Sequence, residues 1–194
     1  MPSHSSEVKI SVYGHPSANP ETVAKHFGGS YVTHAEGDED VAIFVLNPNT
    51  GVDELSISNW NALDDFQTPR MVVVTHLESG EADFDDAVLL ANRLFDQIVT
   101  PYLVLHDDQG TPCALISLET QEIIDYSEST EKVIESEPEH KTLVSEFVEE
   151  YTSHLAIMGD GAFSAGLLFP AIPLWIEKNL GVNIVKQYLS EINR

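Results

Sequence analysis

Two uninterrupted apolar runs constrain the fold of this chain more than any other feature. Val41–Leu46 and Met71–Val74 contain no polar residue, which is typical of strands that are covered on both faces. Apolar residues recur at near-helical spacing between the two runs, from 55 to 63, and again after the second run, from 84 to 95. Strands that alternate with helices favour right-handed crossovers and a parallel sheet. The predicted fold class is therefore α/β.

The flanking segments extend this pattern at both ends. The alternating segment Val8–Tyr13 predicts a first strand. A helix is expected to begin at Pro20 and to end at Gly28, because proline is favoured in a first helical turn and glycine directly after a last one. Leu167–Leu174 is predicted to supply a further strand, and Val182–Ile192 a closing helix.

The middle of the chain has a different pattern. Apolar segments at 102–105, 114–118 and 122–126 are separated by short turn segments without helices, which indicates an antiparallel meander. The stretch from 119 to 150 is strongly acidic and predicts a solvated helix face with an apolar stripe from Leu143 to Tyr151. We therefore predict one compact domain, with a core made of residues 1–99 and 160–194 and an inserted antiparallel and helical subdomain at 100–159.

The charge of the chain limits its partners. A formal net charge of -23, from 32 acidic against 9 basic residues, repels phosphate backbones and anionic headgroups, so we expect neither nucleic acid nor membrane as a direct partner. A basic protein surface or a cation fits better, although adaptation to salt or an acidic proteome explains the sign equally well. The hydrophobic content of 42% separates the chain from disordered acidic polymers.

The cysteine content and the N-terminal residues bear on the compartment. Cys113 is the only cysteine, which excludes an intrachain disulfide, a cysteine-rich zinc site and a redox dithiol. Residues 1–7 lack the basic and apolar regions of a secretory leader, and no stretch approaches the roughly 18 apolar residues of a membrane span. The expected location is the cytoplasm.

Five ordered segments together carry a family resemblance. They are Ile10–His15, Ala42–Val52 with Trp60, Pro69–Glu78 with Ala82–Phe84, Pro101–Tyr126, and Phe169–Leu189. These segments resemble the first, nucleotide-binding domain of the translational GTPases of the elongation factor G type. They cover about four fifths of the chain, and the third is the most specific. The resemblance implies a three-layer, P-loop-NTPase-like G domain with a mostly parallel central sheet and a small antiparallel inserted subdomain.

The chain departs from this family at the phosphate loop, which starts at Gly14 and His15. A loop of the form G-x-x-x-x-G-K-[ST] wraps phosphates with backbone N–H groups, places a lysine on them and directs a hydroxyl at Mg²⁺. Asn19, Pro20 and Glu21 occupy the last three positions here. Proline has no N–H to donate, and the Glu21 carboxylate repels anions. The cradle for phosphate is therefore expected to be lost.

The remaining nucleotide motifs are also altered. The segment from Tyr31 to Asp40 is too short for the first switch loop and the Asp-x-x-Gly loop of the family, so the resemblance implies no residue to hold Mg²⁺ or to orient an attacking water. Thr75 and Glu78 stand in the place of the guanine-reading Asn-Lys-x-Asp motif. Trp175 takes a position that the family gives to the loop around guanine, and we expect it to fill the vacated base pocket.

These departures predict a pseudo-GTPase that neither binds nor hydrolyses GTP. No catalytic residue, metal or cofactor is expected. The alternative is a weak GTP-binding domain that retains affinity, with Mg²⁺, through Glu78 and the backbone amides of the loop. The predicted vestigial nucleotide pocket consists of Gly14, His15, Asn19, Pro20, Glu21, Thr75, Glu78 and Trp175.

Interaction with a protein is the remaining class of function. The resemblance implies a role related to translation and a contact surface on the inserted subdomain, with a ribosomal component as one candidate partner. Because the sequence given ends where the first domain of full-length relatives ends, we do not expect it to translocate ribosomes alone. A decaying paralogue without a selected activity stays open. Ala162–Gly166 approximates a nucleophile elbow, but no histidine and acid follow it in the hydrolase order, so a structural loop is expected.

Overall fold

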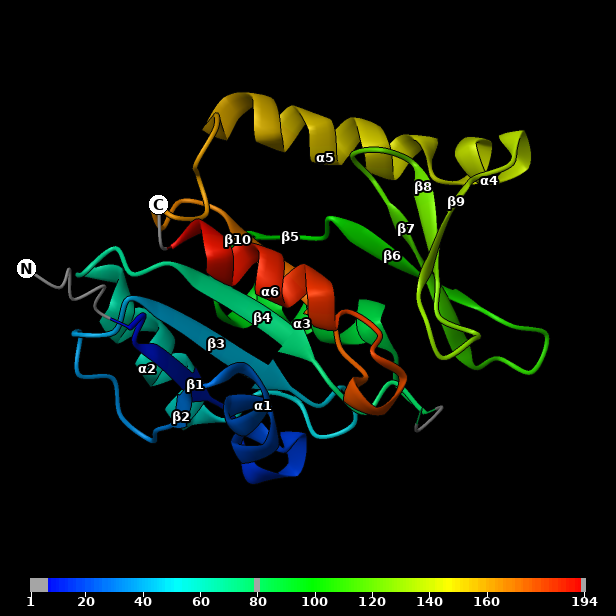
Figure 1. The fold of residues 1–194 in the computed structure, drawn as a ribbon. Coiled ribbons are helices and arrows are strands. Elements are labelled where there is room, and N and C mark those ends of the chain that lie inside the picture. Colours follow the sequence, from blue (N-terminus) through cyan, green and yellow to red (C-terminus); the bar gives the residue numbers. More distant parts are fainter. Residues whose placement is uncertain (1–6, 79–80, 193–194) are drawn as a thin grey trace, which may run out of the picture.

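A six-stranded parallel sheet forms the centre of the computed structural model, which describes residues 7–78 and 81–192 (Figure 1). Its strand order is β2-β1-β3-β4-β10-β5, and each neighbouring pair is parallel. The segment 1–6, in which no leader was expected, lies outside the described residues. The strands are β1 (Ile10–Tyr13), β2 (Ser30–Tyr31), β3 (Val41–Leu46), β4 (Arg70–Val74), β5 (Ile98–Val99) and β10 (Phe169–Pro173).

Helices cover both faces of this sheet. Figure 1 shows α1 and α6 on the near face and α2 and α3 behind it. The placement of helices on both faces follows from the strand order. From β1 the chain moves to β2 at one edge of the sheet, whereas from β3 it moves in the opposite direction to β4. Because both crossovers are right-handed, the helices that connect these strands lie on opposite faces. The helices are α1 (Pro20–Phe27), α2 (Glu54–Asp64), α3 (Phe84–Leu94) and α6 (Val182–Glu191), with short 3₁₀ turns η1 (Pro16–Ala18) and η2 (Ile176–Lys178).

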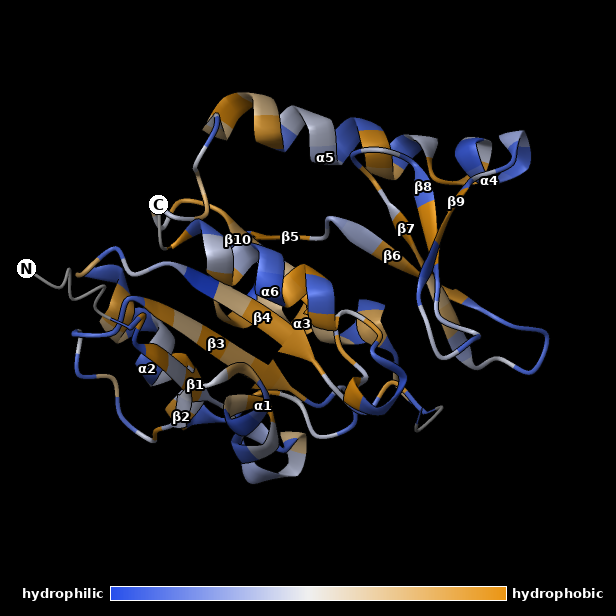
Figure 2. Cartoon of the chain, in the orientation of Figure 1, coloured by the Kyte–Doolittle hydropathy of each residue, from blue (hydrophilic) through white to orange (hydrophobic). Residues whose placement is uncertain are grey.

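The central strands are buried as their composition predicts. All six residues of β3 and all five of β4 are buried, and Figure 2 shows both as apolar ribbons beneath helices of mixed polarity. Trp60 of α2 stacks on Phe95, with ring centroids 4.5 Å apart, and meets Phe44 of β3 edge to face at 4.9 Å. This aromatic cluster fixes α2 against the sheet. The α/β prediction is confirmed.

A second, antiparallel sheet of four strands follows β5. It has the order β6-β7-β8-β9, and α4 (Pro138–Leu143) and α5 (Ser145–Met158) follow it. Figure 1 shows α5 along the top of the molecule, above α6 and β5. The predicted insert, 100–159, contains all of these elements, and its boundaries stay a prediction. The strands are β6 (Tyr102–His106), β7 (Pro112–Ser117), β8 (Glu122–Asp125) and β9 (Lys132–Glu135).

One part of the acidic stretch was predicted wrongly. Lys132–Glu135 forms the edge strand β9 rather than a helix face, with Ile134 opposite Ile123 of β8. All four residues of β9 are exposed, so pairing with β8 decides its conformation and burial does not. The two-residue strands β2 and β5 were also not predicted, because segments this short have no recognisable period.

No helix in the described part of the chain is both long enough and apolar enough to cross a bilayer.

Candidate functional site

The predicted pocket residues meet at the carboxyl ends of β1, β4 and β10. In parallel α/β sheets this edge is the usual position of ligand sites. Asn19, Thr75, Glu78 and Trp175 line one small cavity of about 70 Å³. Gly14, His15, Pro20 and Glu21 do not line it, and instead form the loop and the first helical turn beside it. The structure therefore divides the eight residues between a cavity and a neighbouring loop.

The loop between β1 and α1 bonds its own backbone donors. The N–H of Ser17 donates to Nδ1 of His15 at 3.2 Å, and the N–H of Ala18 donates to the His15 carbonyl at 2.9 Å. The N–H of Asn19 donates to the carbonyl of Pro16 at 3.0 Å. A phosphate cradle needs such N–H groups to converge on a ligand. Here three consecutive donors are engaged inside η1.

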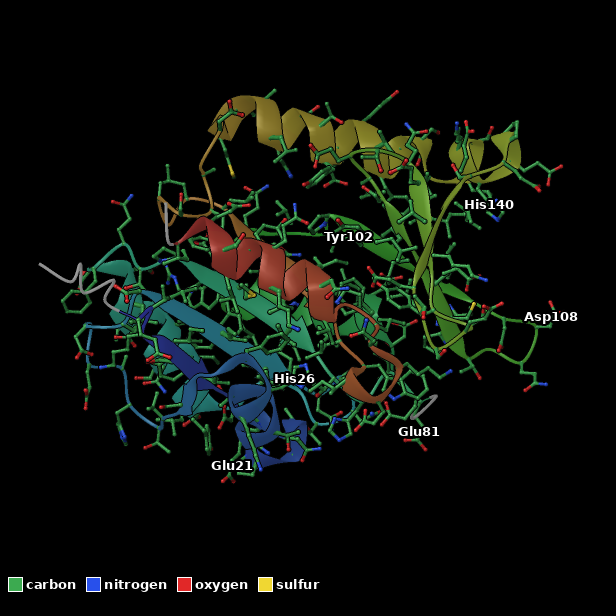
Figure 3. All side chains as sticks on the ribbon, in the orientation of Figure 1. Glu21, His26, Glu81, Tyr102, Asp108 and His140 are labelled. Atoms are coloured by element: carbon green, nitrogen blue, oxygen red, sulfur yellow. The ribbon has the colours of Figure 1, made fainter. Side chains whose placement is uncertain are left out.

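The start of α1 has the residues that the sequence analysis singled out. Asn19 adopts the left-handed conformation, with φ 58° and ψ 48°, and its side chain makes no cap bond. Pro20 is the first residue of the helix and is buried. Glu21 is exposed, and Figure 3 shows it at the outer edge of α1, directed away from the sheet. The Glu21 carboxylate thus lies in the first turn of α1, at the positive end of the helix dipole.

Gly14 is required by close packing. Its φ is 154°, and a Cβ atom at this position would lie 2.6 Å from the carbonyl oxygen of Val45 in β3. The loop therefore leaves β1 in direct contact with the neighbouring strand. The hydroxyl of Tyr31 donates to the Gly14 carbonyl at 3.2 Å and holds the loop from the β2 side.

Three side chains outside the loop hold it: Asn47 and Thr50, which the sequence analysis missed as site residues, and Thr75, which it predicted. The hydroxyl groups of Ser17 and Thr50 lie 2.8 Å apart, and Asn47 binds the main chain of Ser17. On the opposite side, Thr75 Oγ1 donates to the Ala18 carbonyl at 2.9 Å. These contacts join residues 30 to 57 positions apart. Asn47 and Thr50 follow the apolar run of β3, and polar residues at the end of a buried strand were the available signal.

The opposite wall of the cavity is the segment after β10. Trp175 exchanges two backbone hydrogen bonds of 3.0 Å with Leu180, so that the segment closes into a tight loop around η2. The side chain of Trp175 is half-buried, and Nζ of Lys178 lies 4.3 Å from the centre of its ring. This is a cation–π contact. Filling of a base pocket by Trp175 stays a prediction.

The guanine-reading position has a different geometry from the one that the family motif requires. Thr75 Oγ1 is directed at the carbonyls of Ala18 and Leu46, and it lies 3.0 Å from Nδ1 of His76. His76 has a φ of 57°. Glu78 is exposed at the rim of the cavity. Thr75 therefore makes its hydrogen bonds within the protein itself. Glu78, which was predicted, lines this cavity, and so does Glu177, which was not predicted.

Across residues 7–78 and 81–192, no group of three or more histidine, cysteine, aspartate and glutamate side chains is placed to hold a metal ion. A cavity of about 70 Å³ also has room for only a few water-sized groups. The site therefore consists of a loop whose N–H groups are bonded within the loop and a small polar cavity beside it.

Comparison with known proteins agrees with this architecture. No family model matches the chain. Elongation factor G-like proteins of two Mycobacterium tuberculosis strains, CDC 1551 / Oshkosh and ATCC 25618 / H37Rv, are each 27% identical over an alignment of 166 positions, and the match covers 73% of this chain. The chain spans 22% of the length of these relatives.

A crystal structure of a protein from Thermus thermophilus has the same fold, with a TM-score of 0.69 and 22% sequence identity. The match covers 80% of this chain and 27% of that protein. The predicted sequence resemblance to proteins of the elongation factor G type is therefore confirmed, and the α/β fold is shared with the Thermus thermophilus protein.

Proposed function

We propose that this chain is a pseudo-GTPase: a G domain that does not bind or hydrolyse GTP and that acts through contact with another protein. The observation that carries the first half is the loop after β1, where the N–H groups of Ser17, Ala18 and Asn19 are all bonded within the loop. Opening them to a phosphate would break three hydrogen bonds. Pro20 has no N–H to donate in return, and the Glu21 side chain supplies a negative charge where a lysine would supply a positive one.

Titration with a fluorescent GTP or GDP analogue in the presence of Mg²⁺ tests this half. Trp175 lies at the cavity and Trp60 is buried in the core, so quenching of Trp175 gives a second, intrinsic signal. We expect no saturable binding up to millimolar nucleotide. Saturable micromolar binding by the unchanged protein would contradict the proposal and favour the weak GTP-binding alternative.

A loop-restoring variant gives the matching positive experiment. Asn19→Gly, Pro20→Lys and Glu21→Thr together return the glycine, lysine and hydroxyl of a phosphate loop, and we expect measurable affinity once Trp175→Ala is added. The control variant combines Trp175→Ala with unchanged loop residues, and it should not bind the nucleotide. Binding by this control would show that the loop is not the obstacle.

The second half of the proposal rests on an apolar groove between α3 and α5. A cavity of about 360 Å³ there is continuous with one of about 250 Å³, since both are lined by Asp85, Leu103 and Phe147. Leu89 is 66% exposed and Phe147 is 49% exposed at this groove. Apolar surface of this kind marks interaction sites.

The rim of the groove is acidic. Asp83, Asp85 and Glu150 line the two cavities together with His106 and His154, and within the described parts of the chain no lysine or arginine does. Burial raises the pKa of Asp85, and the carboxylates of Asp83 and Asp86 raise it further. We therefore propose a partner that presents an amphipathic helix with basic flanks, such as a segment of a ribosomal component, acting in the cytoplasm.

Affinity capture with matched variants tests the partner. Phe147→Asp places a charge in the groove, whereas Ile157→Asp places one at a position of α5 that is 82% exposed and lines neither cavity. A specific partner should be retained by Ile157→Asp, lost by Phe147→Asp and released by salt. Equal capture by both variants would show that the partner does not bind in this groove, and capture of nothing above background would favour the decaying paralogue.

A further inference from the structure

A second cavity lies where the two sheets and their helices meet, away from the loop after β1. It has a volume of about 90 Å³ and is walled by Tyr102, Tyr151 and Tyr188, with carboxylates from Glu119 and Glu191. Tyr102 belongs to β6, Tyr151 to α5 and Tyr188 to α6, so that three separate elements each contribute one aromatic ring. Figure 3 shows Tyr102 in the space between α5 and α6.

Burial divides the cavity into a base and a rim. Tyr151 and Ser117 are 6% and 7% exposed, whereas Glu119 and Gln187 are exposed. The ring of Tyr188 is held edge to face by the buried Phe163, with centroids 5.0 Å apart. An entering group would therefore pass the Glu119 carboxylate and reach fixed tyrosine rings.

Two glutamates line this cavity, and the carboxylate of the exposed Glu119 is the charge on which the proposal rests. Burial raises the pKa of Tyr151 to about 12, and it raises the pKa values of Tyr102 and Tyr188 as well. The tyrosines are thus neutral at pH 7, and each has Glu119 close enough to add to this rise. Among the residues that the structure describes, no lysine, arginine or histidine lines the cavity.

The end of α6 adds a further preference for positive charge. Glu191 is the last residue of α6, and the last turn of this helix carries no basic side chain. The carbonyl groups at a helix C-terminus bear a partial negative charge that a cation stabilises. A helix end, the Glu119 carboxylate and three tyrosine side chains therefore act in the same direction on one small volume.

We propose that this cavity binds the ammonium group of an organic amine. Aromatic rings attract organic cations through their faces, and carboxylates pair with the N–H donors. An inorganic divalent cation fits less well, because only two carboxylates line the cavity and such ions take six or more oxygen ligands. The ammonium group comes either from a lysine side chain of a protein or from a free polyamine.

Calorimetric titration of the full chain with n-butylammonium, a mimic of the lysine side chain, tests the proposal at constant ionic strength. We expect one saturable site whose Kd rises at least tenfold in Glu119→Gln and at least threefold in Tyr151→Phe. Glu122→Gln, which removes an exposed carboxylate of β8 outside the cavity, is the matched control and should leave the Kd unchanged.

Spermidine and Nα-acetyl-lysine amide distinguish the two sources. Tenfold tighter binding of spermidine than of n-butylammonium indicates a free polyamine, and tighter binding of the lysine derivative indicates a protein side chain. The proposal is overturned when Glu119→Gln and Glu122→Gln weaken binding equally, when sodium competes as well as n-butylammonium, or when no saturation occurs. Tyr151→Phe keeps the ring, so a folded variant is available even where a larger change would disturb the core.

Discussion

The side-chain amide of Asn47 donates a hydrogen bond of 3.0 Å to the main-chain carbonyl oxygen of Ser17. This bond connects the turn after β3 with the loop after β1, and the same Asn47 accepts from the N–H and Nδ2 groups of Asn49 at 3.0 and 3.1 Å. Asn47 is only 6% exposed. One buried amide therefore orders both the turn and the loop that a nucleotide would have to open.

Substitution Asn47→Ala removes this buried amide. It leaves the Ser17 carbonyl without that donor, so we expect a loss of about 1 to 3 kcal/mol in the free energy of unfolding. Urea unfolding followed by circular dichroism measures it. Asn61→Ala is the control, because Asn61 is exposed on α2 and alanine favours a helix. A loss of equal size in the control would contradict a specific role of Asn47.

Arg70 is a buried cation at the start of β4. Its Nη2 lies 2.6 Å from a carboxylate oxygen of Asp64, its Nη1 donates to the Trp60 carbonyl at 2.8 Å, and its Nε donates to the Thr68 carbonyl at 3.2 Å. The guanidinium also lies 4.6 Å from the ring centres of Trp60 and Phe169. A planar group with several donors is needed for this set of contacts.

Replacement Arg70→Lys should therefore destabilise the fold although the charge is kept. We expect a loss of about 2 kcal/mol, because an ammonium group cannot reach all three acceptors and leaves a buried carbonyl unpaired. The midpoint of urea unfolding reports the loss. Arg93→Lys, at an exposed position of α3, should change stability by less than about 0.5 kcal/mol. Equal stability of the two variants would refute this account of Arg70.

Alkaline pH should weaken the fold through its buried tyrosines. Burial raises the pKa values of five of the six tyrosines, and for Tyr13 a hydrogen bond to the Glu39 carboxylate adds to the rise. In the unfolded chain tyrosine titrates near pH 10. Above that pH the folded state keeps protons that the unfolded state releases, so stability falls as pH rises. Below about pH 9 these groups should have no effect.

Urea midpoints between pH 8 and pH 11 measure this dependence. Each tyrosine contributes at most about 1.4 kcal/mol per pH unit. Tyr151, whose pKa is raised to about 12, provides the internal check, since Tyr151→Phe should make the alkaline slope shallower by the share of one proton. A midpoint that is constant up to pH 11 would show that the tyrosines are not held in the neutral form.

Gly181 allows no side chain between β10 and α6. Its φ is 79°, and a Cβ atom would lie 1.9 Å from the carbonyl oxygen of Pro173. Gly181→Ala should therefore reduce the free energy of unfolding by more than about 3 kcal/mol. Gly110→Ala is the matched control, with a φ of 80° and open space around the added atom; it should lose only about 1 to 2 kcal/mol. Thermal unfolding compares the pair, and similar losses would rule out the steric cause.

Local patterns were sufficient to predict the main elements. The apolar runs at β3 and β4, the proline that begins α1, the glycine that ends it and the meander of β6 to β8 all lie where the sequence placed them. Each depends on neighbouring residues only, through side-chain period or backbone preference. The strand β9 was missed because its conformation depends on pairing with β8, and its own residues are exposed and carry charges at both ends.

The sequence by itself determined that this chain folds as an α/β domain, and the family resemblance predicts that Pro20 and Glu21 stand where a phosphate loop has lysine and a hydroxyl. Only the tertiary structure decided how the loop after β1 is held: its amides bond within η1, and Asn47 and Thr75 reach the loop from two other strand ends. It also brought Tyr102, Tyr151 and Tyr188 around one cavity. Helical and strand patterns act over a few residues, whereas these contacts join distant segments whose distance in space is set by the sheet order.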